Sequence, residues 1–93
     1  MVMKTYILII EGDAVSGYSA YFPDVLGCVT AGDSLDEIRR LAAEALALHL
    51  EGDTAPPARS LAEILADPEV ASDLDGSELY VPVAYDAEQF AAA

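Results

Sequence analysis

Residues 4–37 read KTYILIIEGDAVSGYSAYFPDVLGCVTAGDSLDE, and this stretch decides the fold. Residues 4–11 are apolar on both alternating faces, a pattern typical of a central strand that is covered on both sides. The polar segment 12–17 is bounded by glycines and predicts a hairpin loop into a second strand over residues 18–22. A proline and an aspartate then break that strand, and residues 28–31 suit a short third strand. The stretch therefore predicts a three-stranded meander.

Two helices are predicted after the meander by their capping signals. The spacing Ser-x-x-Glu occurs at residues 34–37 and again at 60–63, and this capping box marks the start of a helix. The first helix is expected over residues 35–50, where the apolar positions form a broad stripe that needs burial. The second helix is short, and Pro68 should close it.

The last predicted strand lies near the C-terminus. Residues 78–86, ELYVPVAYD, alternate like a strand, and Pro82 should place that strand at a sheet edge because it has no N–H to donate. The predicted fold class is α+β, with a small antiparallel sheet (the meander plus this C-terminal strand) packed on one long helix. We expect a single domain over residues 1–86 and a loose tail over residues 87–93, because 93 residues leave no room for a second core.

The composition favours some kinds of partner and disfavours others. Four Lys and Arg residues stand against 17 Asp and Glu residues, which gives a formal net charge of −13. This field repels phosphate backbones and anionic lipids, so we expect no direct nucleic-acid binding and no membrane association, whereas a basic protein is attracted. The single cysteine, Cys28, forms no internal disulfide, and the apolar run 6–10 is too short to span a membrane. We therefore expect a cytoplasmic protein.

No arrangement of side chains typical of catalysis occurs in the sequence. His49 is the only histidine, and neither it nor Cys28 has partners at the spacing of zinc ligands. Glu11, Asp13 and Asp24 fall on predicted turns, where aspartate is favoured for backbone reasons alone. Glycine-rich phosphate loops and nucleophile elbows are absent from the sequence. We predict that the protein is not an enzyme and uses no cofactor and no metal.

Three parts of the chain share the pattern of one known family. They are Ile9–Cys28 (IIEGDAVSGYSAYFPDVLGC), residues 29–37 (VTAGDSLDE) and the alanine- and leucine-rich helix. The most specific residues are Gly17-Tyr18, Tyr21-Phe22-Pro23-Asp24 and Gly27-Cys28, and the PP-x-x-S-L-x-E run at 56–63 also fits. Over residues 4–86 the chain resembles the HicB antitoxin family.

This resemblance implies a partial ribonuclease-H-like α+β fold without the nuclease activity of that fold. It also implies a partner, because antitoxins of the family bind a small basic RNA-cleaving toxin, HicA, and hold it inactive. Two departures from the family pattern are visible. Many members continue into a DNA-binding segment, whereas this sequence stops at Ala93 after an alanine tail, and Leu26 stands where a proline is usual. Direct DNA binding is therefore not expected.

Three functions are compatible with these features. The first is an antitoxin that binds and neutralises a HicA-like basic toxin by forming a protein complex. The alternative is an orphan HicB-like regulatory or scaffolding module that associates with itself and has no toxin partner. A metal-dependent nuclease has the least support, because it needs carboxylates that converge in one cleft. An uncovered sheet on so small a domain also predicts a homodimer or a higher homo-oligomer.

The candidate partner-binding residues lie around the second strand. Ser19 and Tyr21 form the more polar face of that strand, Asp24 follows on the turn, and Glu11 or Asp13 stands across the hairpin. An aromatic anchor flanked by carboxylates is the composition expected of a binding hot spot with a charged rim. Two other interpretations stay open. Either Tyr21 covers a contact between two copies while Asp24 stabilises its own turn, or the partner binds the exposed side of the long helix.

Overall fold

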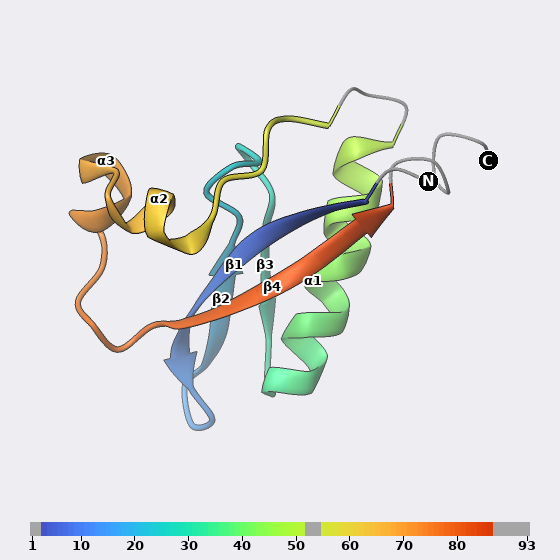
Figure 1. Ribbon diagram of the computed structural model, residues 1–93. Coiled ribbons are helices and arrows are strands. Elements are labelled where there is room, and N and C mark those ends of the chain that lie inside the picture. The colour runs from blue at the N-terminus through green and yellow to red at the C-terminus, as the bar shows by residue number, and fades with distance from the viewer. Residues whose placement is uncertain (1–2, 52–54, 87–93) are drawn as a thin grey trace.

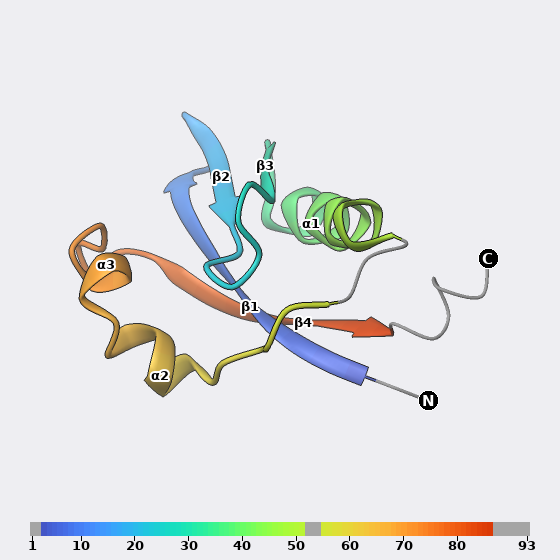
Figure 2. The same ribbon diagram turned by 90° about the horizontal axis from the view of Figure 1, so that it is seen from above.

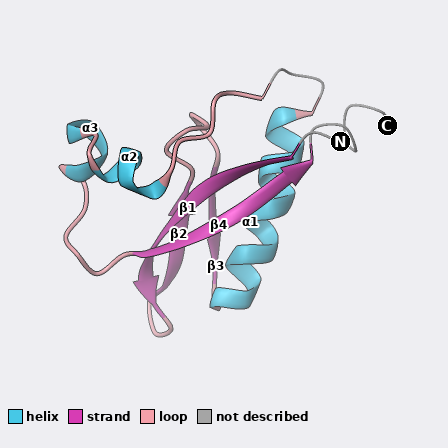
Figure 3. Ribbon diagram, in the orientation of Figure 1, coloured by secondary structure: helices cyan, strands magenta, loops and turns pink. Residues whose placement is uncertain are grey.

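The computed structural model describes residues 3–51 and 55–86, and this part of the chain forms four strands and three helices. In chain order they are β1 (Met3–Asp13), β2 (Gly17–Tyr21), β3 (Val29–Gly32), α1 (Leu35–Leu50), α2 (Leu61–Leu65), α3 (Pro68–Ala71) and β4 (Leu79–Asp86). Figure 1 shows the four strands beside the long helix α1, and Figure 3 separates the element types by colour. The predicted α+β class is confirmed.

The sheet is antiparallel and has the order β3-β2-β1-β4. β1 is an inner strand, as its two apolar faces predicted, and it pairs with β2 along one side and with β4 along the other. β4 is an edge strand, which fits the missing N–H of Pro82. The meander β1-β2-β3 and the added C-terminal strand are therefore as expected from the sequence.

The two faces of the sheet are covered differently. α1 lies against one face, which we call the inner face, whereas α2 and α3 lie on the opposite, outer side (Figure 2). Between α1 and the inner face lies the main core, whose buried members are Tyr6, Leu8, Ile10, Ala20, Phe22, Val25, Cys28, Ile38, Ala42, Leu46, Leu50 and Tyr85. On the outer side, Ile9 of β1 and Ile64 of α2 are both fully buried. Each fully buried isoleucine contributes about 1.5–3 kcal/mol through the hydrophobic effect.

The β1–β2 hairpin is tighter than the sequence predicted. β1 continues to Asp13, two residues beyond the expected end of the strand, and pairs there with Gly17. Asp13 Oδ1 accepts hydrogen bonds from the backbone N–H of Val15 and of Ser16, at 2.9 and 2.7 Å, and so closes the turn. Gly12 has a φ of 104°, and a Cβ there would lie 2.2 Å from the carbonyl oxygen of Gly17. Glycine is therefore required at position 12.

Both predicted helix starts are present, although the two caps differ. Ser60 and Glu63 form the full reciprocal capping box at α2. At α1, Ser34 Oγ accepts from the N–H of Glu37, but Glu37 Oε1 accepts from the N–H of Asp33 instead of Ser34. The first helix thus starts at the predicted residue with only half of the box.

The end of the second helix differs from the prediction. α2 ends at Leu65, and Pro68 begins the additional short helix α3 instead of only closing α2. Asp67 caps α3 through Oδ1, which accepts from the N–H of Glu69 at 3.0 Å. Proline suits the first turn of a helix, because a backbone N–H at that position would have no acceptor within the helix. The expected tail over residues 87–93 lies outside the described residues, so the domain boundary at residue 86 stays a prediction.

Candidate functional site

A row of four side chains crosses the outer face of the sheet. The register makes Tyr21 of β2 the neighbour of Ile9 in β1 and of Val29 in β3, and Tyr80 of β4 lies on the other side of Ile9. Ile9 is fully buried and Tyr21 is half-buried, whereas the side chain of Val29 is 69% exposed. The row therefore forms an apolar strip with Tyr21 near its centre.

Two open hollows meet at Tyr21 and Val29. The first, which we call the strand hollow, has a volume of about 520 Å³, and Glu11 and Ser19 belong to its lining. The second, the loop hollow, has a volume of about 300 Å³ and lies between the loop 22–28 and the segment that carries α3. Tyr21 is thus accessible from two sides, and its neighbourhood is concave enough to receive a protruding side chain.

Acidic groups surround the phenol of Tyr21. Burial raises the pKa of Tyr21, and the negative charges of Glu11, Asp73 and Glu78 raise that pKa further. Tyr21 therefore keeps its O–H, which can donate as well as accept a hydrogen bond. The same negative charges attract a cationic group to the phenol. The combination of an aromatic ring with several carboxylates suits a basic partner.

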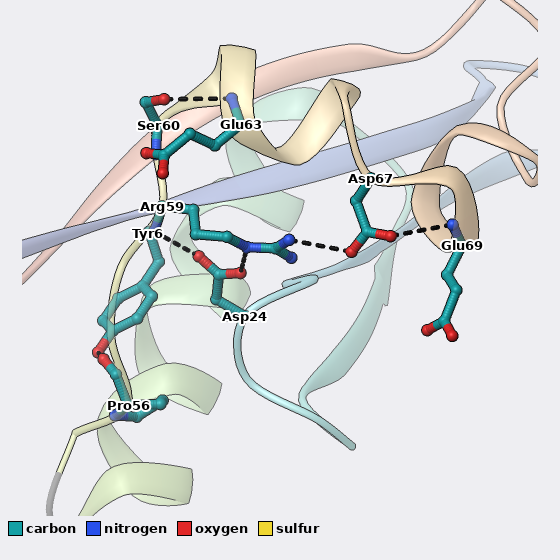
Figure 4. Close-up of polar contacts among 8 residues, drawn as sticks. All are labelled: Tyr6, Asp24, Pro56, Arg59, Ser60, Glu63, Asp67 and Glu69. Carbon is teal, nitrogen blue, oxygen red and sulfur yellow. Dashed lines mark hydrogen bonds and ion pairs between the residues drawn. The ribbon is translucent and has the colours of Figure 1, made fainter.

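Three side chains form a charged bridge beneath this region (Figure 4). The carboxylate of Asp24 accepts from the backbone N–H of Arg59 and from Arg59 Nε, both at 2.6 Å. Arg59 Nη1 donates to Asp67 Oδ2 at 2.9 Å. We call Asp24, Arg59 and Asp67 the Arg59 bridge. Hydrogen bonds to Asp67 and Asp24 raise the pKa of Arg59, and the guanidinium lowers the pKa of Asp67.

The segment that carries Arg59 is also tied to the start of β1. Tyr6 Oη donates to the carbonyl oxygen of Pro56 at 2.6 Å, and Lys4 Nζ donates to the carbonyl oxygens of Ala55 and Pro56, both at 3.3 Å. Burial raises the pKa of Tyr6, and the charge of Asp24 adds to this effect. These contacts hold residues 55–60 across the sheet and fix where Arg59 meets the loop 22–28.

The structure brings together three of the five residues predicted for the partner site. Tyr21, Ser19 and Glu11 line the strand hollow. Asp24 differs from the expectation of a free acidic rim, because only 5% of its side chain is exposed and its carboxylate binds Arg59. Asp13 stands at the hairpin tip, where hydrogen bonds from Ser16 and Val15 lower its pKa.

Sequence reasoning missed two contributors to this region. Arg59 was not singled out from the sequence. It is the only Lys or Arg among residues 47–93, so an ion pair with one of the many acidic residues could have been expected. Asp67 was not considered, and Pro68 was expected to close the second helix, although the pair Asp67-Pro68 is a typical start of a helix. Because Arg59 and Asp24 lie 35 positions apart in the chain, no local pattern could pair them.

The described residues assemble no recognisable catalytic centre. Within residues 3–51 and 55–86, no group of three or more His, Cys, Asp or Glu side chains is placed to hold a metal ion. His49 is exposed near the end of α1, and Cys28 is buried, which raises the pKa of its thiol. No helix in this part of the chain is long and apolar enough to cross a bilayer.

The fold is that of a small α+β domain, built from a four-stranded antiparallel sheet, one long helix and two short helices. A family model described as the HicB-like antitoxin of bacterial toxin-antitoxin systems matches residues 6–83. The chain therefore belongs to the HicB-like antitoxin family. No curated protein matches the chain.

Solved structures of antitoxins have the same fold. The antitoxin HicB of Burkholderia pseudomallei is 21% identical, with a TM-score of 0.77 over 97% of this chain and 69% of that one. An antitoxin HicB3 is 27% identical, with a TM-score of 0.72 over 94% of this chain and 65% of that one. A chain of the HicA3–HicB3 toxin-antitoxin complex is 29% identical, with a TM-score of 0.64 over 86% of this chain and 95% of that one.

Proposed function

We propose that this protein is the antitoxin of a toxin-antitoxin pair, and that it neutralises a small basic RNA-cleaving toxin of the HicA type by forming a stoichiometric protein complex. Membership of the HicB-like family supports this function. So does the similarity to a chain of the HicA3–HicB3 complex. The observation that carries the proposal is the acidic, concave face around Tyr21, which offers a basic protein both an apolar anchor and negative charge.

The charge of the whole chain supports the same partner. A net charge of −13 accelerates the encounter with a basic protein, because opposite fields steer diffusing molecules together. An antitoxin that inhibits an RNA-cleaving toxin must be in the same compartment as the toxin and its RNA substrate. We therefore infer that this protein works in the cytoplasm. The protein itself acts as an inhibitor in this scheme and performs no chemistry.

We place the partner on the outer face of the sheet. Tyr21 is the central anchor, Ser19 offers a hydroxyl beside it, and Glu11 supplies negative charge directly across the hairpin from Ser19. Asp13 extends the acidic rim at the hairpin tip. Asp24 supports this surface from below through Arg59 and does not touch the partner.

The test uses the basic protein encoded by the neighbouring reading frame. We expect the two purified proteins to form a stable complex, and we expect RNA cleavage by the basic protein to stop when the antitoxin is added in equal amount. The measurement is cleavage of a labelled RNA during titration, with complex formation followed by gel filtration. Cleavage that continues at a several-fold excess of the antitoxin would contradict the proposal.

A second candidate function is a self-associating scaffold without a toxin. It is favoured by the exposed apolar side chains near the loop hollow, Leu26 at 87% exposure and Val29 at 69%. A second copy that covers them makes a homodimer, and such a dimer is also compatible with toxin binding elsewhere. Sedimentation velocity of the isolated chain distinguishes a monomer from a dimer. The absence of a basic neighbouring reading frame, together with a stable dimer, would favour the scaffold.

A further inference from the structure

We propose that the Arg59 bridge is a positioning device for partner binding: it fixes the spacing between the loop 22–28 and α3 and so keeps the loop hollow open for the toxin. The inference rests on the proposed function and adds to it a residue whose role is to hold the wall of the loop hollow in place. Arg59 binds the loop through Asp24 and binds the cap of α3 through Asp67. Figure 4 shows that the guanidinium lies between the two carboxylates.

The helices on this side depend on such links for their position. α2 has five residues and α3 has four, and helices this short are not stable alone. They pack chiefly on each other, and the buried Ile64 is the apolar anchor that α2 contributes. Among the hydrogen bonds and ion pairs of residues 3–51 and 55–86, the Arg59 bridge is the one that joins the loop 22–28 to α3.

Two residues of the Arg59 bridge also line the loop hollow, so the bridge can determine the shape of that hollow. Tyr21 and Val29 line the loop hollow on the strand side, and Val70 and Asp73 line it on the helix side. Arg59 and Asp67 belong to the same lining. A change in the bridge therefore moves one wall of the hollow relative to Tyr21, without removing any of the side chains that we assign to the partner.

Charge and geometry give opposite expectations for the loss of Arg59, which makes the proposal testable. The guanidinium neutralises carboxylate charge on both sides, so its removal makes the surface more negative and favours encounter with a basic protein. If Arg59 mattered only for charge, binding would be faster and at least as tight. If Arg59 positions the α3 side of the loop hollow, its loss leaves complex formation intact but makes dissociation faster, because the geometry of an interface acts mainly on the dissociation rate.

The experiment measures association and dissociation rates of the neighbouring basic protein with three forms of the full chain. We expect Arg59→Gln to raise koff at least about tenfold while kon stays the same or rises. Arg59→Lys keeps the charge but lacks the planar fork that binds two carboxylates, so we expect koff to lie between those of the wild type and Arg59→Gln. Arg40→Gln is the matched control, because it removes one exposed charge on α1 and should leave koff unchanged.

A second measurement is independent of the partner. We expect amide hydrogen exchange in residues 61–71 to accelerate in Arg59→Gln while the core strand β1 keeps its protection. If Arg59→Gln does not fold, Asp67→Asn breaks only the outer half of the bridge and should give a smaller rise in koff with the same exchange pattern. A folded Arg59→Gln with wild-type koff and wild-type exchange would overturn the inference. If the wild type binds no basic protein, the proposed function fails, whereas the exchange result still decides whether Arg59 positions α3.

Discussion

Tyr21 combines an apolar ring with a polar hydroxyl in a single side chain. Its ring lies between Ile9 and Val29 on the outer face, and its phenol stays protonated because burial and nearby carboxylates raise its pKa. Tyrosine is enriched at binding hot spots because it offers a large rigid surface and one hydrogen-bonding group at little cost in conformational entropy. These properties make Tyr21 the side chain whose loss should weaken the complex most.

Truncation of Tyr21 is the first prediction at this scale. We expect Tyr21→Ala to weaken binding of the neighbouring basic protein by about 2 kcal/mol, whereas Tyr21→Phe keeps the ring and should lose less. Isothermal titration calorimetry measures both affinities, and circular dichroism checks that each variant is folded. A folded Tyr21→Ala with wild-type affinity would move the interface away from the outer face, and the exposed side of α1 would be the next surface to examine.

Asp67 gives the second residue-scale prediction, which concerns pH. Its hydrogen bond from Arg59 lowers its pKa in the folded protein, so its contribution is complete above about pH 4, the ordinary pKa of aspartate, and disappears as the pH falls through the lower folded value. We therefore expect Asp67→Asn to unfold at a lower temperature than the wild type at pH 7, and we expect this difference to shrink as the pH falls below about 4. Thermal unfolding over this pH range measures the difference. A gap that stays constant with pH would show that the charge of Asp67 is not what stabilises the fold.

At the scale of elements, the β1–β2 hairpin and the helix caps show how local chemistry sets boundaries. Asp13 closes the hairpin with its own side chain, and Ser34 and Ser60 each satisfy an N–H group at a helix start. Gly12 lets the two strands approach more closely than any side chain would allow. Because each signal acts within a few residues, the bounds of these elements can be predicted from the local sequence.

Substitution of Gly12 tests this view of the hairpin. Gly12→Ala places a Cβ against the carbonyl of Gly17 in a left-handed backbone conformation, and we expect it to lower the free energy of unfolding by about 2–3 kcal/mol. Gly76→Ala is the matched control, because its φ of 95° is similar but a Cβ there meets nothing within 4 Å. We expect a loss of about 1 kcal/mol for that control. Urea unfolding measures both, and equal losses would mean that the close approach to Gly17 has no separate cost.

The same local signals explain how much the sequence predicted. Alternating apolar residues and two Ser-x-x-Glu pairs were sufficient for four strands, their antiparallel class and both helix starts, because these features depend on neighbours in the chain. Strand alternation alone also puts Ser19 and Tyr21 on one face of β2, whereas the choice between Glu11 and Asp13 across the hairpin depended on the register, which pairs Glu11 with Ser19. The burial and pairing of Asp24 could not be predicted, because its partner Arg59 lies 35 positions away in the chain and comes close only in the folded protein. α3 was missed because Pro68 was interpreted only as a helix breaker, whereas α2 already ends at Leu65 and Pro68 begins a new helix.

At the scale of the whole molecule, the four Lys and Arg residues do not offset the 17 acidic ones, and most of them already interact with groups of the fold. Lys4 and Arg59 are bonded within the fold. Arg39 and Arg40 are exposed on α1, where Arg40 lies 3.6 Å from Glu44. The outer face carries the candidate partner surface, whereas these two arginines lie on the helix that covers the inner face. Neither of these exposed arginines therefore lies on the outer face, where we propose that the basic partner binds.

This charge distribution predicts how the isolated protein behaves with DNA and with salt. We expect no shift of its own promoter fragment at about 0.1 M salt, because phosphate contacts require several exposed basic groups on one face. Association with the basic partner should slow as salt rises from about 0.05 to 0.3 M, with little change in dissociation. Gel-shift and stopped-flow measurements test the two parts. A specific, salt-sensitive DNA complex of the isolated chain would contradict the first part, and a salt-independent association rate would contradict the second.

The pairing of β1 with β4 has a consequence for how the protein is made. β1 is translated well before β4, yet Met3 pairs with Asp86 and Ile10 with Leu79, so one side of β1 has no neighbour until the chain has been translated through β4. Closing so long a loop is slow relative to local hairpin and helix formation. During that interval the open side of β1 exposes unpaired backbone groups, which invite aggregation and proteolysis. The complete pairing of β1 therefore depends on how quickly β4 docks against it, and a chain that lacks β4 should be more prone to proteolysis than one that contains it.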